Sequence, residues 1–181
     1  DVSIWDGPLH LTVTVLATPA GIDPVKRSGG KPGDVICVTG KLGKSYPTDH
    51  HLTFEPRLDI ARAIAQYPAT RPHCMIDISD GLARDLGHLC EMSNVSAVIE
   101  QSKLPCRDNA NWQQAVGDGE DYELLFATDH AAIGSPGTWE VMGVPITVIG
   151  RMVKSDNQPT VKIKLVDGNI VDLNDQGWEH H

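Results

Sequence analysis

The stretch from 74 to 90 constrains the fold most, because a short apolar run passes there directly into a helix-forming segment. Residues 74–78 read CMIDI, which is typical of a short buried strand. After them, apolar side chains recur at the spacing of one helical face, namely Leu82, Leu86, Leu89 and Cys90. That spacing predicts an amphipathic helix with its apolar side against a core. The chain must therefore turn from strand to helix within the few polar residues between the two segments.

The other segments mix strand and helix patterns without a regular alternation of the two. Strands are predicted at 9–17, 35–39, 96–100, 122–128 and 146–153, with a hairpin over 161–173. Helices are predicted from Glu55 up to Pro68 and over 108–116. This order favours the α+β class, with a mixed, largely antiparallel sheet and helices packed on one side of it.

Charge and hydropathy exclude two classes of partner. The chain has 15 Lys and Arg against 24 Asp and Glu, a formal net charge of −9, so we expect no nucleic acid as a partner. The longest apolar run, 9–17, is interrupted by His10 and two threonines and is far shorter than the ~20 residues that span a bilayer. We therefore also expect no membrane partner.

The four cysteines are scattered along the chain at Cys37, Cys74, Cys90 and Cys106. They lack the Cys-x-x-Cys spacing of zinc and redox sites, and three of them lie in apolar segments. Reduced, buried thiols in a cytoplasmic protein are the expectation.

Three polar residues crowd the junction between the predicted strand and helix. Asp77 and Ser79 lie on one face of the strand and leave the sheet together, and Asp80 follows at the start of the helix. Either Ser79 or Asp80 could simply cap the helix. One cap needs one residue, however, and a helix start attracts anions. The additional carboxylates would be explained by Mg2+ lying between them and a bound polyphosphate.

A second acidic cluster lies in GDGEDYELLF, residues 117–126. A turn between glycines there presents Asp118, Glu120 and Asp121 just before an apolar strand. Taken alone, it could equally be a solvated acidic turn, because turns collect Asp and Gly for local reasons.

A possible phosphate loop at Gly43-Lys44-Ser45 is rejected. The motif requires a glycine at the position of Val38 and a helix where Pro47 stands. A tight turn is predicted there instead.

The two acidic clusters taken together are more specific than either one. MIDISDGLARDLGHLCE, GEDYELLF, the upstream RSGGKPGDVICVTG and the final GWEH resemble thiamine-monophosphate kinases. The resemblance runs from Asp1 to His180. It implies the fold of the aminoimidazole-ribonucleotide synthetase superfamily, which includes selenophosphate synthetase and a hydrogenase-maturation protein. In that fold, ATP lies between an N-terminal dimerisation domain and a C-terminal α+β domain.

The resemblance implies that most of the N-terminal domain is absent from this chain. Residues 1–20 would be its remnant, and 21–181 would form the C-terminal domain. The full-length protein would be a homodimer that moves the γ-phosphate of ATP onto thiamine monophosphate, giving thiamine diphosphate and ADP. The chain by itself is expected to have low or no activity.

The resemblance also assigns the metal and ATP positions. Asp77 and Asp80 match ligands of Mg2+ and would carry the catalysis, and Ser79 matches a residue that touches ATP. Asp1 matches a position that binds both metal and ATP. Arg27 matches an arginine that contacts ATP, and without the resemblance it would be taken as a solvated loop charge.

Two further positions match residues that contact thiamine monophosphate. Glu120 would face the donors and positive charge of that substrate. Trp178 would place an indole against its cationic ring. An ordinary core tryptophan is the alternative for Trp178.

Two other functions fit the same motifs. A sister ATP-dependent enzyme, such as one like selenophosphate synthetase, would need a reactive Cys or selenocysteine in an N-terminal loop outside this chain. A catalytically silent module for nucleotide binding or dimerisation would bind ATP or ADP without turnover.

Overall fold

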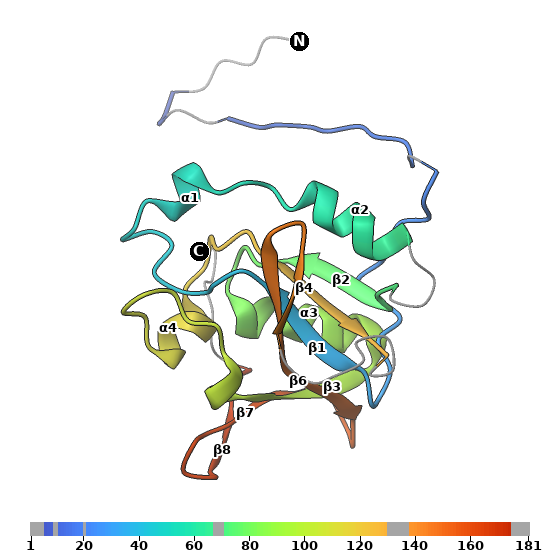
Figure 1. Ribbon diagram of the computed structural model, residues 1–181, viewed down its shortest axis with the longest axis vertical. Helices are drawn as coiled ribbons and strands as arrows, with labels where there is room; N and C mark the ends of the chain where they lie inside the picture. The colour runs from blue at the N-terminus through green and yellow to red at the C-terminus, as the bar shows by residue number, and fades with distance from the viewer. Residues whose placement is uncertain (1–5, 9–10, 20, 67–70, 130–137, 175–181) are drawn as a thin grey trace.

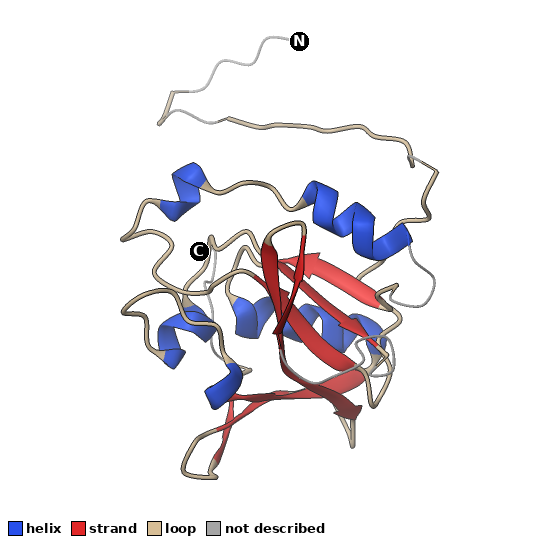
Figure 2. Cartoon of the chain, in the orientation of Figure 1, coloured by secondary structure: helices blue, strands red, loops and turns tan. Residues whose placement is uncertain are grey.

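The fold is known from a computed structural model that describes residues 6–8, 11–19, 21–66, 71–129 and 138–174. In this part of the chain, one sheet of eight strands forms the centre (Figures 1 and 2). Its strands are β1 Val35–Thr39, β2 Cys74–Asp77, β3 Val95–Glu100, β4 Leu124–Thr128, β5 Thr138–Val141, β6 Val144–Lys154, β7 Val161–Lys164 and β8 Ile170–Asp172. They lie in the order β2-β4-β1-β6-β3-β7-β8, and β5 pairs with β6.

The sheet is largely antiparallel, as predicted. Only β3 and β7 pair in parallel among the described strands, and β1 pairs antiparallel with β4 and β6. The α+β class is therefore confirmed. The hairpin predicted over 161–173 forms from β7 and β8.

The helices cover both faces of the sheet, which corrects the expectation that they pack on one side. They are α1 His50–Thr53, α2 Leu58–Gln66, α3 Leu82–Ser93, the short 3-10 helix η1 Gln101–Lys103 and α4 Trp112–Gly117. Along β1, alternate side chains join two cores: Ile36 packs with α3 and α4, whereas Cys37 packs with α2. Figure 1 shows α2 and α3 on opposite sides of the strands. Within the described residues, no helix is long and apolar enough to cross a membrane.

The strand predicted at 9–17 does not form in its described part. Residues 11–19 have no regular structure and run outside the body of the molecule, beyond α1 and α2 (Figure 1). Leu11, Val13 and Val15 are 80%, 86% and 81% exposed. Their alternation suits a half-buried strand, but a strand needs a neighbour to accept its hydrogen bonds, and no described strand pairs with this segment.

Three of the four cysteines follow the prediction of buried thiols. All four are free thiols; Cys37, Cys74 and Cys90 are buried, whereas Cys106 is half-buried. Burial raises the pKa of Cys74 to about 11 and that of Cys90 to about 12. These thiols are therefore protonated packing groups and poor nucleophiles at neutral pH.

Candidate functional site

The backbone of the junction between β2 and α3 is held by a residue that the sequence did not point to, Asp85. Gly81 occupies the N-cap position with φ 109° and no side chain caps the helix there. Instead the buried Asp85 reaches back from the first turn, and its Oδ2 accepts the N–H groups of Ser79 and Asp80, both at 3.0 Å. The capping role considered for Ser79 or Asp80 is therefore wrong. The Asp77 side chain is exposed and that of Asp80 is half-buried.

The second acidic cluster packs directly on this junction. The N–H of Glu120 donates to the carbonyl of Ser79, and the N–H of Tyr122 donates to that of Ile78, both at 2.8 Å. Gly119 permits this approach, because a Cβ there would lie 2.6 Å from the Ser79 carbonyl oxygen. The structure thus brings Ser79 and Glu120, which lie 41 positions apart in the sequence, into one site.

In the second cluster, some carboxylates are buried and hydrogen-bonded within the protein, whereas another is exposed to solvent. Asp121 is fully buried and accepts hydrogen bonds from the N–H of Gly43 and from Arg107. Glu123 is also buried, and Arg57 binds both of its oxygens at 2.8 Å. Glu120, which directly precedes Asp121, is exposed. Its carboxylate is therefore the one that lies open to solvent among Glu120, Asp121 and Glu123.

The turn at Gly43-Lys44-Ser45 supports this loop, and its prediction as a turn is confirmed. The N–H of Gly43 donates to Asp121 and the N–H of Lys44 donates to Asp118, both at 2.8 Å. The hydroxyl of Ser45 donates to the carbonyl of Glu120. The N–H groups that would cradle a phosphate in a phosphate loop are thus occupied by carboxylates.

Negative charge is concentrated at the junction. Burial raises the pKa of Asp85 to about 6, and the charges of Asp80 and Asp77 add to this, against the two N–H groups that stabilise the carboxylate. Ligand atoms of Asp80, Asp85 and His88 all lie within 4.8 Å of one another. Two carboxylates and one imidazole are able to hold a divalent cation, but Asp77, which was predicted as a ligand together with Asp80, is not a member of this group. Asp85 and His88 were not predicted, although their spacing of three residues on a helix was a readable signal.

Arg27 lies at the other end of α3 from the acidic junction. It is exposed, and its carbonyl accepts a hydrogen bond from the hydroxyl of Ser93, the last residue of the helix, at 3.4 Å. The carbonyl of the preceding residue, Lys26, accepts the N–H of Met75 in β2 at 3.0 Å, so this segment also runs beside the strand that ends at Asp77. Asp1 and Trp178, the two other predicted site residues, lie outside the described residues.

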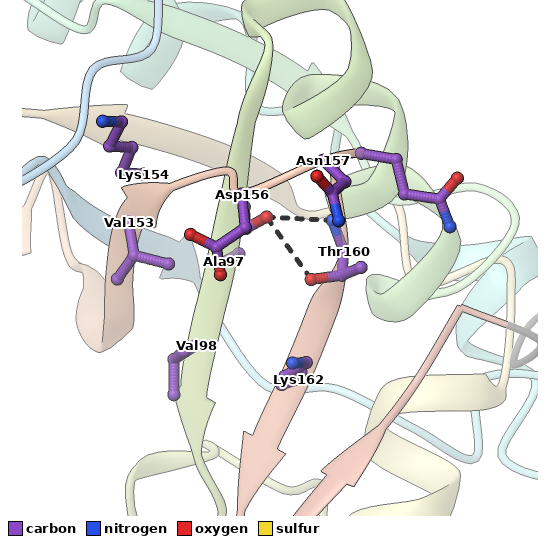
Figure 3. A pocket seen from close by; sticks show the side chains of 10 residues that line it. Ala97, Val98, Val153, Lys154, Asp156, Asn157, Thr160 and Lys162 are labelled. Carbon is purple, nitrogen blue, oxygen red and sulfur yellow. Dashed lines mark hydrogen bonds between the residues drawn. The ribbon is translucent and has the colours of Figure 1, made fainter.

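A shallow pocket of about 430 Å³ lies elsewhere, over β3, β6 and β7 (Figure 3). The hydroxyl of Ser96 accepts hydrogen bonds from the N–H and the hydroxyl of Thr160, at 3.1 and 3.3 Å. Strands β4 and β1 separate this region from β2. None of the predicted site residues that the structure describes lines the pocket.

Asp121 should make stability depend on pH. Burial raises its pKa from 3.8 to about 6, against the N–H of Gly43 and the charge of Arg107. Its carboxyl therefore favours the folded state most below about pH 4, and this contribution is lost as the pH rises through about 6. We compare the free energy of unfolding of the wild type with that of Asp121→Asn. The wild-type value minus the variant value should decrease as the pH rises from about 4 to about 6. Urea denaturation at several pH values measures it, and a constant difference would contradict the prediction.

Comparisons with known proteins support the fold and the family resemblance. No family model matches the chain. The thiamine-monophosphate kinase of Rhodopirellula baltica is 36% identical over 165 residues, which cover 84% of this chain and 50% of that protein. The solved structure of AaThiL complexed with AMPPCP and TMP superposes with a TM-score of 0.62 at 28% identity, covering 87% of this chain and 54% of that one.

A hydrogenase maturation protein, HypE in complex with ATP, shares the fold alone. Its TM-score is 0.61 at 14% identity, over 86% of this chain and 54% of that protein. The chain thus matches thiamine-monophosphate kinases in sequence and in fold, and the resemblance inferred from its motifs is confirmed. It spans about half the length of the relatives that it matches.

Proposed function

Because the chain is related to thiamine-monophosphate kinases over about half of their length, we propose that it is the C-terminal part of such a kinase. The whole enzyme would transfer the γ-phosphoryl group of ATP to thiamine monophosphate, giving thiamine diphosphate and ADP. The contact between the two acidic loops at Ser79 and Glu120 carries this proposal. This contact places Asp77 and Asp80, whose carboxylates suit a metal-bound nucleotide, next to Glu120, whose carboxylate suits thiamine monophosphate.

Asp77 and Asp80 are the proposed Mg2+ ligands. Asp77 is the last residue of β2 and Asp80 lies three residues after it, and their carboxylate oxygens suit a hard cation. When bound, Mg2+ would neutralise the charge of the phosphates that must meet. Asp85 holds the backbone of Ser79 and Asp80 through two N–H groups, so it fixes the position of the proposed ligand Asp80.

In this reaction no side chain of the protein needs to form a covalent bond with a substrate. A phosphate oxygen of thiamine monophosphate forms a bond to the γ-phosphorus of ATP, and the bond from that phosphorus to the oxygen of ADP breaks. The attacking oxygen is already anionic, so no strong general base is required. Positioning and charge neutralisation supply the rate.

The remaining contacts are proposed from the family. Ser79 would touch ATP, and the exposed Glu120 would bind thiamine monophosphate. Arg27 and Asp1 would contact ATP, with Asp1 also binding metal, and Trp178 would face the acceptor.

The domain division is proposed on the same basis. Residues 1–20 would end the N-terminal domain, and 21–181 would form the C-terminal domain of a cytoplasmic homodimer. The exposed apolar side chains of residues 11–19 support this division. They suit a strand that pairs with strands of the N-terminal domain and not with the sheet of residues 21–181.

The decisive experiment is a phosphorylation assay on the longer protein that contains this chain. With ATP, Mg2+ and thiamine monophosphate, we expect chromatography to show thiamine diphosphate, and its formation to require all three. The 181-residue chain alone should give little or none. ATP binding without product would favour the silent module, and selenide-dependent ATP consumption would favour the sister enzyme; either result would overturn the proposal.

A further inference from the structure

Two aromatic rings from distant parts of the chain stack beside the acidic loops. Phe54 follows α1 and Tyr122 precedes β4. Their ring centroids lie 4.2 Å apart, with an angle of 24° between the ring planes. Both side chains are half-buried, so part of the pair remains accessible to a ligand.

The backbone holds Tyr122 in an unusual conformation. Its φ is 50° and that of Glu120 is 63°, a region that residues with a side chain seldom adopt. Such conformations persist where the surroundings fix them, and they gather at functional sites. Here the buried carboxylates of Asp121 and Glu123 anchor the residues next to Tyr122. The ring is therefore presented by a rigid turn.

The surroundings of the pair suit an aromatic cation. The N–H of Tyr122 donates to the carbonyl of Ile78, the residue after Asp77, and the N–H of Glu120 donates to the carbonyl of Ser79, both at 2.8 Å, so Tyr122 lies beside the acidic junction. A cation is attracted both by the faces of aromatic rings and by carboxylates. The adenine of ATP is neutral at pH 7, whereas the thiazolium ring of thiamine monophosphate carries a permanent positive charge. The pair is thus matched to the acceptor.

We propose that Phe54 and Tyr122 form an aromatic wall that binds the cationic ring of the phosphate acceptor and positions it beside Glu120. This inference rests on the proposed function, because it names part of the acceptor side of the same site. The pair determines which acceptor is bound, and it leaves the binding of ATP unchanged.

The test uses the longer protein with Tyr122→Leu, Phe54→Leu and Tyr122→Phe. Loss of a ring should raise KM for thiamine monophosphate about 3- to 30-fold and leave KM for ATP within about twofold. Tyr122→Phe keeps the ring and should stay close to wild type. Tyr46→Leu is the matched control, because Tyr46 is 73% exposed and stacks on His51 instead. Equal changes in both KM values, or none, would refute the wall.

Calorimetric binding separates this inference from the proposed function. Wild type should bind thiamine monophosphate more tightly than its neutral deaza analogue, and Tyr122→Leu should lose that preference. If no phosphoryl transfer occurs but the preference is present, the kinase assignment fails and the wall stands. If transfer occurs and the preference is absent, the wall fails alone. Phe54 lies outside the strained turn, so Phe54→Leu decides the matter if Tyr122→Leu does not fold.

Discussion

Replacing Asp77 with Asn in the longer protein should lower the rate of phosphoryl transfer on the order of 100-fold or more, with the fold intact. The Asp77 side chain is exposed at the end of β2, and its backbone keeps its pairing with Leu124 in β4. The substitution removes one negative charge from the proposed metal site and changes almost no volume. Catalysis by charge neutralisation is therefore lost while packing is kept. Steady-state kinetics and circular dichroism measure the two effects.

The matched control for this prediction is Asp108→Asn. Asp108 carries the same kind of side chain but lies on the exposed surface, where it pairs with Lys41 at 2.9 Å. The control should transfer phosphate at the wild-type rate. Wild-type rates in Asp77→Asn as well would show that the acidic junction has no catalytic part.

Local patterns predicted most elements of the fold but not how they meet. The strand at 74–78 and the helix after it were readable, because each pattern repeats within a few residues. The amphipathic pattern of α2 predicts one buried face without saying which side of the sheet buries it. The alternation at 9–17 predicts a strand, but whether a strand forms depends on a neighbour that the described residues do not supply.

In the candidate site, too, the local patterns could be read from the sequence and the long-range contacts could not. The carboxylates at Asp77, Asp80 and Glu120 stood out because several acids crowd one turn. The residues that hold the acidic loop in place could not be identified in the same way, since they come from other parts of the chain. Arg107 and Gly43, which bind the buried Asp121, lie 14 and 78 residues from it. Nothing within GDGEDYELLF distinguishes a buried acid from an exposed one; the partners do.

The ion pair of Arg57 with Glu123 shows how much such a support should matter. Their side chains are 17% and 3% exposed, and they are 66 residues apart in the sequence. Glu123 also accepts a hydrogen bond from the hydroxyl of Thr39. We expect Arg57→Met to lower the free energy of unfolding by about 3–5 kcal/mol, because it leaves a buried carboxylate without its countercharge. Urea denaturation near pH 7 measures this loss.

The double variant Arg57→Met with Glu123→Met tests the cause of that loss. If an unpaired buried charge is responsible, removing the second charge should restore much of the stability, since apolar replacements of a buried pair are often tolerated. Lys41→Met is the matched control, because its pair with Asp108 is exposed, and it should leave the unfolding midpoint unchanged. A double variant as unstable as Arg57→Met alone would mean that packing and hydrogen bonding of the guanidinium, rather than its charge, hold the loop of Glu120 against the junction.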